Sequence, residues 1–596
     1  MMKKRNDIAK KYKWRIEDMY QSAAEWERDF ISAERAAKRY SARFSGRLAE
    51  DGRTLLAAFK SADRLWQLTE RVYVYARMKR DEDNANAHSQ ALADRAQALI
   101  AKISAAASFF TPEFLAIPRG RLAKLVKDER GLAAYDYAIR VMLREKEHVL
   151  SKKEENLLAR LGEVLDVSGD IFTMLNNADM KFGTIKDEKG RAREVTHGNY
   201  ITFLQSPERS VRKAAYTAVY DAYKKQKNTL ATTYSYNTKT DALMARIRNY
   251  GSSLERSLAG DNVPAAVYEN LIRSVGANLP TLHRYLGIKK KALGLRKMAM
   301  YDVYLPLFKL RTDKVKYEDA LGIMEKALVP LGEDYIAKMR AGVDMGWIDV
   351  FENENKTSGA YSFGCYDSMP YILMNYEGRM KDVFTLVHEM GHSMHSFYTR
   401  AAQPFRYGGH SIFTAEVAST VNESLLMHYL LGTMKGKAAQ KYLLNMYIEE
   451  FRTTLFRQTM FAEFELLTHR AAERGEVLTS DLLCEIYGKL NAKYFGPAVE
   501  QDEDIGFEWS RIPHFYRAFY VYKYATGFSA ATAISAGILA GGAEAAENYI
   551  RFLKSGNSDD PIELLKIAGV DMRSKEPVDN AMKVFEELVD RLEALV

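Results

Sequence analysis

Residues 386–395, LVHEMGHSMH, place three histidines and a glutamate close together. If this segment is helical, His388 and His392 stand one turn apart on the same face, about 6 Å along the axis. That spacing lets two imidazole nitrogens bind one tetrahedral metal ion. Glu389 projects beside the ion, where its carboxylate can take a proton from water that the metal acidifies. The pattern favours a zinc site with its own general base over a half-buried helix that carries unrelated histidines.

A zinc hydrolase needs a third protein ligand. An extended histidine motif would place further ligands at positions that hold Met394 and Tyr398, so that solution fails. The segment SIFTAEVASTVNESLLMHYLL offers Glu416 and Glu423, which are seven residues apart and share a helical face. One of the two carboxylates can bind the ion while the other accepts the free N–H of a ligand histidine. Their apolar neighbours favour this reading over a solvated acidic edge.

Hydrolysis of an amide also requires donors for the developing oxyanion. The segment RIPHFYRAFYVYKYATG carries one histidine and several tyrosines, and a neutral phenol can donate a short hydrogen bond. We predict His514 and Tyr522 as catalytic donors, with Tyr516 and Tyr520 as substrate contacts. The alternative is an aromatic stripe in the core, which is the commoner use of such residues.

The segment before the histidines, residues 346–378, is rich in Gly, Tyr, Asn and Ser and ends in the β-type run YILMNY. An extended peptide could add to a strand edge here through main-chain hydrogen bonds, and Gly359 and Tyr361 are the predicted contacts. His410 follows two glycines, which indicate a bendable loop between the two ligand helices. A substrate contact and a simple surface loop are equally compatible with it.

Helical periodicity surrounds these motifs. Apolar residues recur every three or four positions in residues 22–44, 53–83 and 86–110, and the chain has only 13 prolines. The pattern of residues 182–197 predicts a hairpin with its turn at Lys189 and Gly190. We therefore predict a mainly α protein with a small β segment beside the metal-binding helices. The predicted division is an N-terminal helical domain, 1–200, that ends in the hairpin, and a catalytic domain, 201–596.

Composition and charge indicate which classes of partner and which cellular location to expect. The 596 residues carry a formal net charge of +8, with acids and bases interleaved, so a nucleic-acid partner is not expected. The two cysteines, Cys365 and Cys484, indicate a reducing compartment rather than a disulfide framework. The N-terminus lacks the apolar stretch of a signal peptide. The uncharged run 524–543 is built of small residues and reads as an interior helix, so we expect a cytoplasmic protein without a membrane partner. No pattern indicates an oligomeric state.

Several ordered motifs resemble the thimet oligopeptidase and oligoendopeptidase F metallopeptidases. HEMGHSMH followed by GHSIFTAEVASTVNESLL is similar to the active-site region of that family. The oligoendopeptidase F branch is indicated by four other stretches: GAYS…PYILMNYEG, IPHFYRAFYVYKYATG, YDVYLPL and FRQTMFAEFE. The likeness runs from about residue 182 to the C-terminus. In the thimet branch the histidine and the tyrosines are more widely spaced than here.

The resemblance implies His388, His392 and Glu416 as ligands of one zinc ion per chain, Glu389 as general base, and Glu423 as a partner of a ligand histidine. It also implies two mostly helical halves around a deep channel that admits only short unstructured peptides. The expected activity is therefore zinc-dependent endopeptidase cleavage of oligopeptides. The competing interpretations are a zinc hydrolase of another amide, a catalytically silent helical peptide-binding protein, and a structural zinc site. Cobalt or manganese would also suit these ligands.

Overall fold

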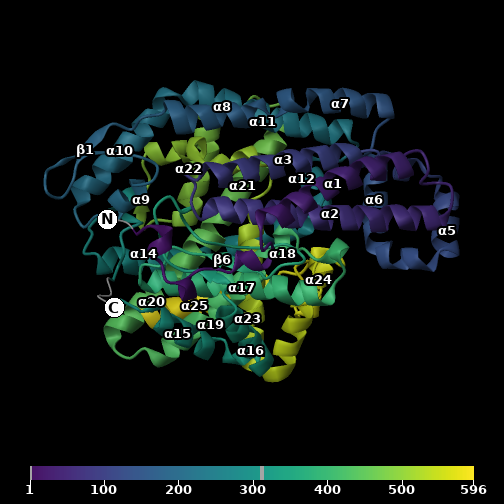
Figure 1. Ribbon diagram of the computed structural model, residues 1–596. Helices are drawn as coiled ribbons and strands as arrows, with labels where there is room; N and C mark the ends of the chain where they lie inside the picture. The colour runs from purple at the N-terminus through teal and green to yellow at the C-terminus, as the bar shows by residue number, and fades with distance from the viewer. Residues whose placement is uncertain (1–2, 309–313) are drawn as a thin grey trace. The chain divides into compact units, whose positions relative to one another are not determined.

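The computed structural model describes residues 3–308 and 314–596 and is mainly helical (Figure 1). The chain forms two compact units, each assembled from three separate stretches. Unit 1 comprises Met1–Val149, Thr312–Leu426 and Ile534–Gly569, and unit 2 comprises Leu150–Arg311, Met427–Ala533 and Val570–Val596. This division by compactness differs from the predicted functional boundary at residue 200, which stays a prediction.

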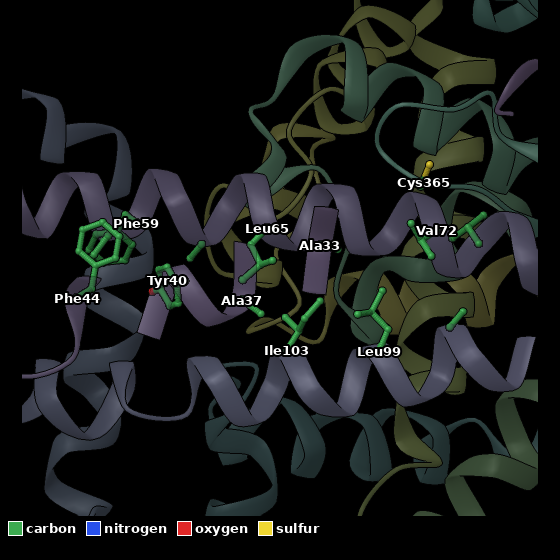
Figure 2. Packing of buried hydrophobic residues seen from close by; sticks show 14 of the residues in the cluster. Ala33, Ala37, Tyr40, Phe44, Phe59, Leu65, Val72, Leu99, Ile103 and Cys365 are labelled. Carbon is green, nitrogen blue, oxygen red and sulfur yellow. The ribbon is translucent and has the colours of Figure 1, made fainter. Parts of the chain in front are cut away.

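Unit 1 begins with long amphipathic helices that pack side by side. Side chains such as Ala33, Tyr40, Phe59, Leu99 and Ile103 fill the space between the first three helices (Figure 2). The small alanines let the helices approach closely, and the aromatic rings fill the wider gaps. The helices of this stretch are α1 (Ala23–Phe44), α2 (Gly52–Asp81), α3 (Ala87–Ala107), α4 (Phe110–Ala116), α5 (Arg119–Asp128) and α6 (Asp136–Glu145).

The second stretch of unit 1 holds the histidine motif and a three-stranded sheet. The strand order is β4-β6-β5, with β4 parallel and β5 antiparallel to β6, so β5 is an edge strand. Both β5 and β6 contact α17, which confirms the predicted β segment beside the histidine helix. The elements are α15 (Tyr317–Ala327), α16 (Glu333–Asp344), β4 (Ile348–Asp349), β5 (Tyr361–Phe363), β6 (Tyr371–Leu373), α17 (Met380–Ala402), α18 (Ile412–Ala415) and α19 (Val417–Thr433), which continues into unit 2 after Leu426.

Unit 2 is also helical and contains two small β pairs. The antiparallel pair β1 and β2 lies within the predicted hairpin, and β3 pairs with β7 in parallel. The elements up to β3 are α7 (Lys152–Leu165), α8 (Val167–Met174), β1 (Thr184–Lys186), β2 (Ala192–Glu194), α9 (Tyr200–Leu204), α10 (Arg209–Lys225), α11 (Lys227–Ile247), α12 (Ser253–Ala259), α13 (Ala265–Ala277), α14 (Leu279–Ala292) and β3 (Met298–Ala299). The later ones are α20 (Lys437–Glu450), α21 (Arg457–Glu473), α22 (Ser480–Phe495), β7 (Val499–Glu500) and α25 (Glu576–Glu593).

Two helical segments of the described chain, Ala87–Ala116 and Tyr522–Leu553, are long and apolar enough to span a membrane by length and composition. This is weak evidence, because core helices of soluble proteins have the same properties. Tyr522–Leu553 is helix α23, whose most apolar window is 61% buried, as predicted for an interior helix. It bends at Gly542 and carries the chain from unit 2 into unit 1, where α24 (Pro561–Ile567) follows.

Candidate metal centre and active site

The two histidines of the motif and one of the two later glutamates converge on a single point in unit 1. Nε2 of His388 and Nε2 of His392 each lie 3.4 Å from Oε2 of Glu416. The ligand atoms of these three residues all lie within 4.8 Å of one another. Atoms bound at about 2.1 Å to one tetrahedral ion are separated by about 3.4 Å, so this spacing fits zinc.

Glu423 is the outer partner of this group. Its Oε2 lies 3.2 Å from Nδ1 of His388, on the side of the ring opposite the Glu416 contact. A carboxylate in this position holds a ligand imidazole in the tautomer that leaves Nε2 free to bind a metal. The residue pattern left open which glutamate faces the metal position. In the structure Glu416 lies beside Nε2 of both histidines, and Glu423 lies beside Nδ1 of His388.

Electrostatics at Glu416 also suit a cation. Burial raises the pKa of its carboxyl, but the hydrogen bonds from His388 and His392 outweigh that effect and hold the pKa well below the usual value. The Ser419 hydroxyl donates to Oε2 of Glu416 at 3.2 Å and fixes the carboxylate further. The group is therefore an anion aimed between two imidazoles, which is a donor set that zinc prefers.

Two helices must approach closely to bring these ligands together, and Gly391 permits it. A Cβ atom at Gly391 would lie 2.6 Å from Cα of Ser419 and 2.7 Å from the carbonyl oxygen of Ala418. Asn422 adds a hydrogen bond across the same interface, donating to the carbonyl oxygen of Val387 at 3.3 Å. Neither residue was predicted from the sequence. A glycine inside a helical motif costs about 1 kcal/mol relative to alanine, and this was the available signal.

Glu389 lies on α17 beside the ligands and is only 7% exposed. Burial raises the pKa of its carboxyl, an effect that His388 and His392 oppose. The backbone N–H of Ser362 on edge strand β5 donates to the carboxylate, and the Ser362 hydroxyl pairs with that of Ser393 on α17 at 2.8 Å. The candidate base is thus anchored between the ligand helix and the sheet.

The predicted substrate contacts of unit 1 are held by neighbours. The Tyr361 hydroxyl donates to Asp81 at 2.9 Å, and the carbonyl oxygen of Gly359 accepts from Asn375 at 2.8 Å. His410 stacks on His395 with 3.9 Å between ring centroids. Burial lowers the pKa of His410 to about 3, with Arg400 and His392 adding to the effect, so the ring is neutral.

The aromatic segment that carries His514 belongs to unit 2. The rings of His514, Tyr520 and Tyr524 form a triangle with centroid separations of 6.1, 5.9 and 5.5 Å. Burial and then the nearby Arg517 lower the pKa of His514, which keeps the imidazole neutral at neutral pH. Tyr516 stacks on Phe172 at 4.4 Å.

Tyr522, the other predicted donor, lies in the interior of unit 2. Its side chain is fully buried in unit 2, with its ring centroid 5.1 Å from that of Tyr268. Its role as a donor stays a prediction. The rings of Tyr520 and Tyr524, by contrast, lie against the ring of His514.

Comparison with known proteins identifies the family. The model for peptidase family M3 matches residues 202–584, and the oligopeptidase F model matches residues 113–182. The chain belongs to peptidase family M3. The match to the second model extends the resemblance into the N-terminal helices, beyond the stretch from about residue 182 that the motifs indicate.

Full-length relatives place the chain in the oligoendopeptidase F branch of M3 peptidases. It is 46% identical to oligopeptidase PepF of Bacillus subtilis over 592 residues, which is 99% of this chain and 88% of that one. The crystal structure of oligoendopeptidase-F from Enterococcus faecium is 40% identical and covers 96% of this chain and 99% of its own, with a TM-score of 0.74. A Chlamydophila abortus structure described as a peptidase is 33% identical and covers all of both chains, with a TM-score of 0.92. The resemblance inferred from the motifs is confirmed.

Proposed function

We propose that this M3 peptidase is a zinc-dependent endopeptidase that hydrolyses short unstructured oligopeptides. The observation that carries the proposal is the convergence of His388, His392 and Glu416 on one point, with Glu389 beside them on the same helix. The names of the relatives, which are oligopeptidases and oligoendopeptidases, support the substrate class. One zinc ion per chain is the proposed cofactor.

His388, His392 and Glu416 would hold the ion, and Glu423 would orient the His388 ring. Zinc in such a site polarises the scissile carbonyl and lowers the pKa of water toward about 7. The remaining steps belong to side chains of the protein.

Glu389 is the proposed general base. Its carboxylate removes a proton from the attacking water and then delivers that proton to the leaving amine. A raised pKa suits both steps, because a carboxyl that holds its proton more firmly is a stronger base and still a competent acid. The N–H of Ser362 keeps the carboxylate in place during the transfer.

His514 and the tyrosines beside it are proposed as donors to the oxyanion. A neutral imidazole and a phenol donate hydrogen bonds without adding charge, and preorganised donors of this type contribute about 100-fold or more to the rate. The geometry within unit 2 favours Tyr520 and Tyr524 over Tyr522 for this role.

The edge strand β5 is the proposed docking site for the peptide backbone. Added main-chain hydrogen bonds bind any sequence in extended form, and Tyr361 and Gly359 lie on or beside that strand. His410 and Tyr516 remain proposed substrate contacts. A deep channel that excludes folded proteins stays a prediction of the family resemblance, and so do a cytoplasmic location and the absence of nucleic-acid and membrane partners.

The test is hydrolysis of an internally quenched oligopeptide before and after removal of metal with a chelator. We expect activity to disappear with the metal and to return when about one equivalent of zinc per chain is added back. A tightly folded protein that contains the same cleavage sequence should stay intact. Undiminished cleavage by a preparation shown to be metal-free would refute the proposal.

A further inference from the structure

The turn between η12 (Pro513–Tyr516) and α23 holds a phenylalanine where glycine is ordinarily required. The N–H of Tyr520 donates to the carbonyl oxygen of Arg517 at 3.2 Å and closes a four-residue turn. Phe519, the third residue of this turn, has a φ of 55°. Every other described non-glycine residue with positive φ is an asparagine. A bulky side chain adopts this conformation only under strain.

Two sets of contacts hold Phe519 in the strained conformation. Its backbone N–H donates to Oε1 of Glu465 at 2.9 Å. Its ring, 1% exposed, lies against Tyr268 at 5.6 Å and His469 at 4.5 Å between centroids. Strain of this kind persists only where the surroundings fix both backbone and side chain, and it gathers at functional sites.

Glu465 is an unusual group to find in this position. It lies on α21 with no exposed surface, and its Oε2 has no hydrogen-bond partner among the described residues. Burial raises the pKa of its carboxyl well above the usual value, the Phe519 N–H opposes the rise, and Asp241 adds to it. The neighbouring Tyr268 hydroxyl donates elsewhere, to the carbonyl oxygen of Ala462 at 2.7 Å. A buried carboxyl is costly, and the hydrogen bond from the Phe519 N–H offsets part of that cost.

The turn determines how the aromatic donors meet. His514 lies on η12 before the turn, Tyr520 is its last residue, and Tyr524 follows one helical turn later on α23. A change of φ at Phe519 from the left-handed to the ordinary region would rotate Tyr520 away from His514, because every atom after the bond moves with it. The stacked pair, now 6.1 Å apart between centroids, would separate.

We propose that Glu465 is a positioning residue: its carboxyl holds the N–H of Phe519 and thereby the left-handed turn that sets Tyr520 beside His514. The inference deepens the proposed function and rests on it, since it assumes that these aromatic groups act on the substrate. Glu465 itself touches neither substrate nor metal in this account.

Three substitutions at Glu465 distinguish the role of its oxygen as a hydrogen-bond acceptor from the role of its charge. Glu465→Gln keeps an oxygen acceptor at the same reach but cannot ionise. Glu465→Asp keeps the carboxyl but withdraws it by one bond, about 1.5 Å. Glu465→Met fills the space and accepts nothing. Glu463→Gln is the matched control, because Glu463 lies on the same helix and pairs instead with Lys493 at 2.7 Å.

The readouts are kcat and KM on a quenched oligopeptide, bound zinc, and hydrogen exchange of backbone amides in residues 515–521. We expect Glu465→Gln and Glu463→Gln to stay within about threefold of wild type in kcat. Glu465→Asp and Glu465→Met should lose about 100-fold in kcat with KM and zinc content nearly unchanged, because the donors are misplaced while binding persists. Exchange at 515–521 should rise in these two variants alone.

If Glu465→Met exchanges rapidly throughout and is therefore unfolded, the comparison of Asp with Gln decides. Wild-type kcat in Glu465→Asp, or a Gln variant as impaired as the Asp variant, would overturn the inference. If wild type cleaves no peptide at all, the proposed function fails instead. Exchange at 515–521 then still tests the turn, and equal protection in all variants would overturn the role of Glu465.

Discussion

Nδ1 of His388 lies 3.2 Å from Oε2 of Glu423 while Nε2 of the same ring faces Glu416. This relationship predicts that Glu423 tunes metal affinity without binding the metal. Glu423→Ala should weaken zinc binding by about 10- to 100-fold, the usual cost of losing an outer partner of a ligand histidine. Glu423→Gln, which retains an oxygen acceptor, should lose less, and Glu416→Ala should lose more than either.

Competition with a chromophoric chelator measures these affinities directly. Equal zinc affinity in wild type and Glu423→Ala would show that the carboxylate does not support His388.

Gly391 is predicted to be essential for the approach of α17 to α19. Gly391→Ala places a methyl group 2.6 Å from the Ser419 backbone, so the helices must separate. Overpacking of this kind costs about 1–3 kcal/mol of stability and should also move Glu416 away from the histidines. Thermal unfolding and zinc affinity should therefore fall together.

The control is Gly322→Ala on α15, where a Cβ atom meets nothing within 4 Å. It should be neutral or slightly stabilising, because alanine has the higher helix propensity. Equal behaviour of the two variants would contradict the close-packing account.

The tyrosines near His514 should differ in their effect on turnover. Tyr520→Phe or Tyr524→Phe should lower kcat by about 100-fold if its hydroxyl donates to the oxyanion, with little change in KM. Tyr522→Phe removes a hydroxyl from the core of unit 2 and should act mainly on stability. A loss of kcat confined to Tyr522→Phe would support the assignment predicted from the sequence.

Acid sensitivity should depend in part on Glu508. Burial raises the pKa of this carboxyl, but Arg457 and Arg511 outweigh burial and lower the pKa from 4.5 to about 2. Because the folded-state pKa is depressed, the carboxylate stabilises the fold above pH 4.5, and this contribution disappears as the pH falls toward 2. The contribution of this carboxylate to the free energy of unfolding amounts to about 3 kcal/mol.

Thermal unfolding of wild type and Glu508→Gln at several pH values tests this. The variant should be less stable at pH 7, since the partner that lies 2.7 Å from Arg457 loses its negative charge, and its stability should fall less between pH 5 and pH 3. If the stability of the two proteins depended on pH in the same way, the ion pairs of Glu508 would not be the source of the acid sensitivity.

Local helix geometry explains why much of the site could be predicted from the sequence. The four-residue spacing of His388 and His392 and the position of Glu389 depend only on the period of one helix. The same period predicted Glu416 and Glu423 on one face, and in the structure Glu416 is the residue between α18 and α19, the helix that carries Glu423. These residues converge in the structure as expected, and the mainly helical fold with a small sheet beside α17 is confirmed.

Features that depend on two separate segments were not predictable in this way. The role of Gly391 requires knowing that α19 crosses α17 at that residue. The choice among the tyrosines after His514 has a related difficulty: the turn at Phe519 interrupts the helix between His514 and Tyr522, so their relative positions do not follow from one helical period. Nor does the amino-acid pattern reveal that each compact unit draws on three stretches of the chain.

The most direct test of the central claim is cleavage of an internally quenched oligopeptide by wild type and Glu389→Gln, with bound metal quantified in both. The substitution preserves shape and leaves His388, His392 and Glu416 in place, so the account predicts about one zinc ion per chain in each protein. It also predicts a loss of kcat of several orders of magnitude in the variant, because the amide of glutamine cannot accept the proton of water. Cleavage by Glu389→Gln at the wild-type rate, or a wild-type enzyme that cleaves without bound metal, would contradict it.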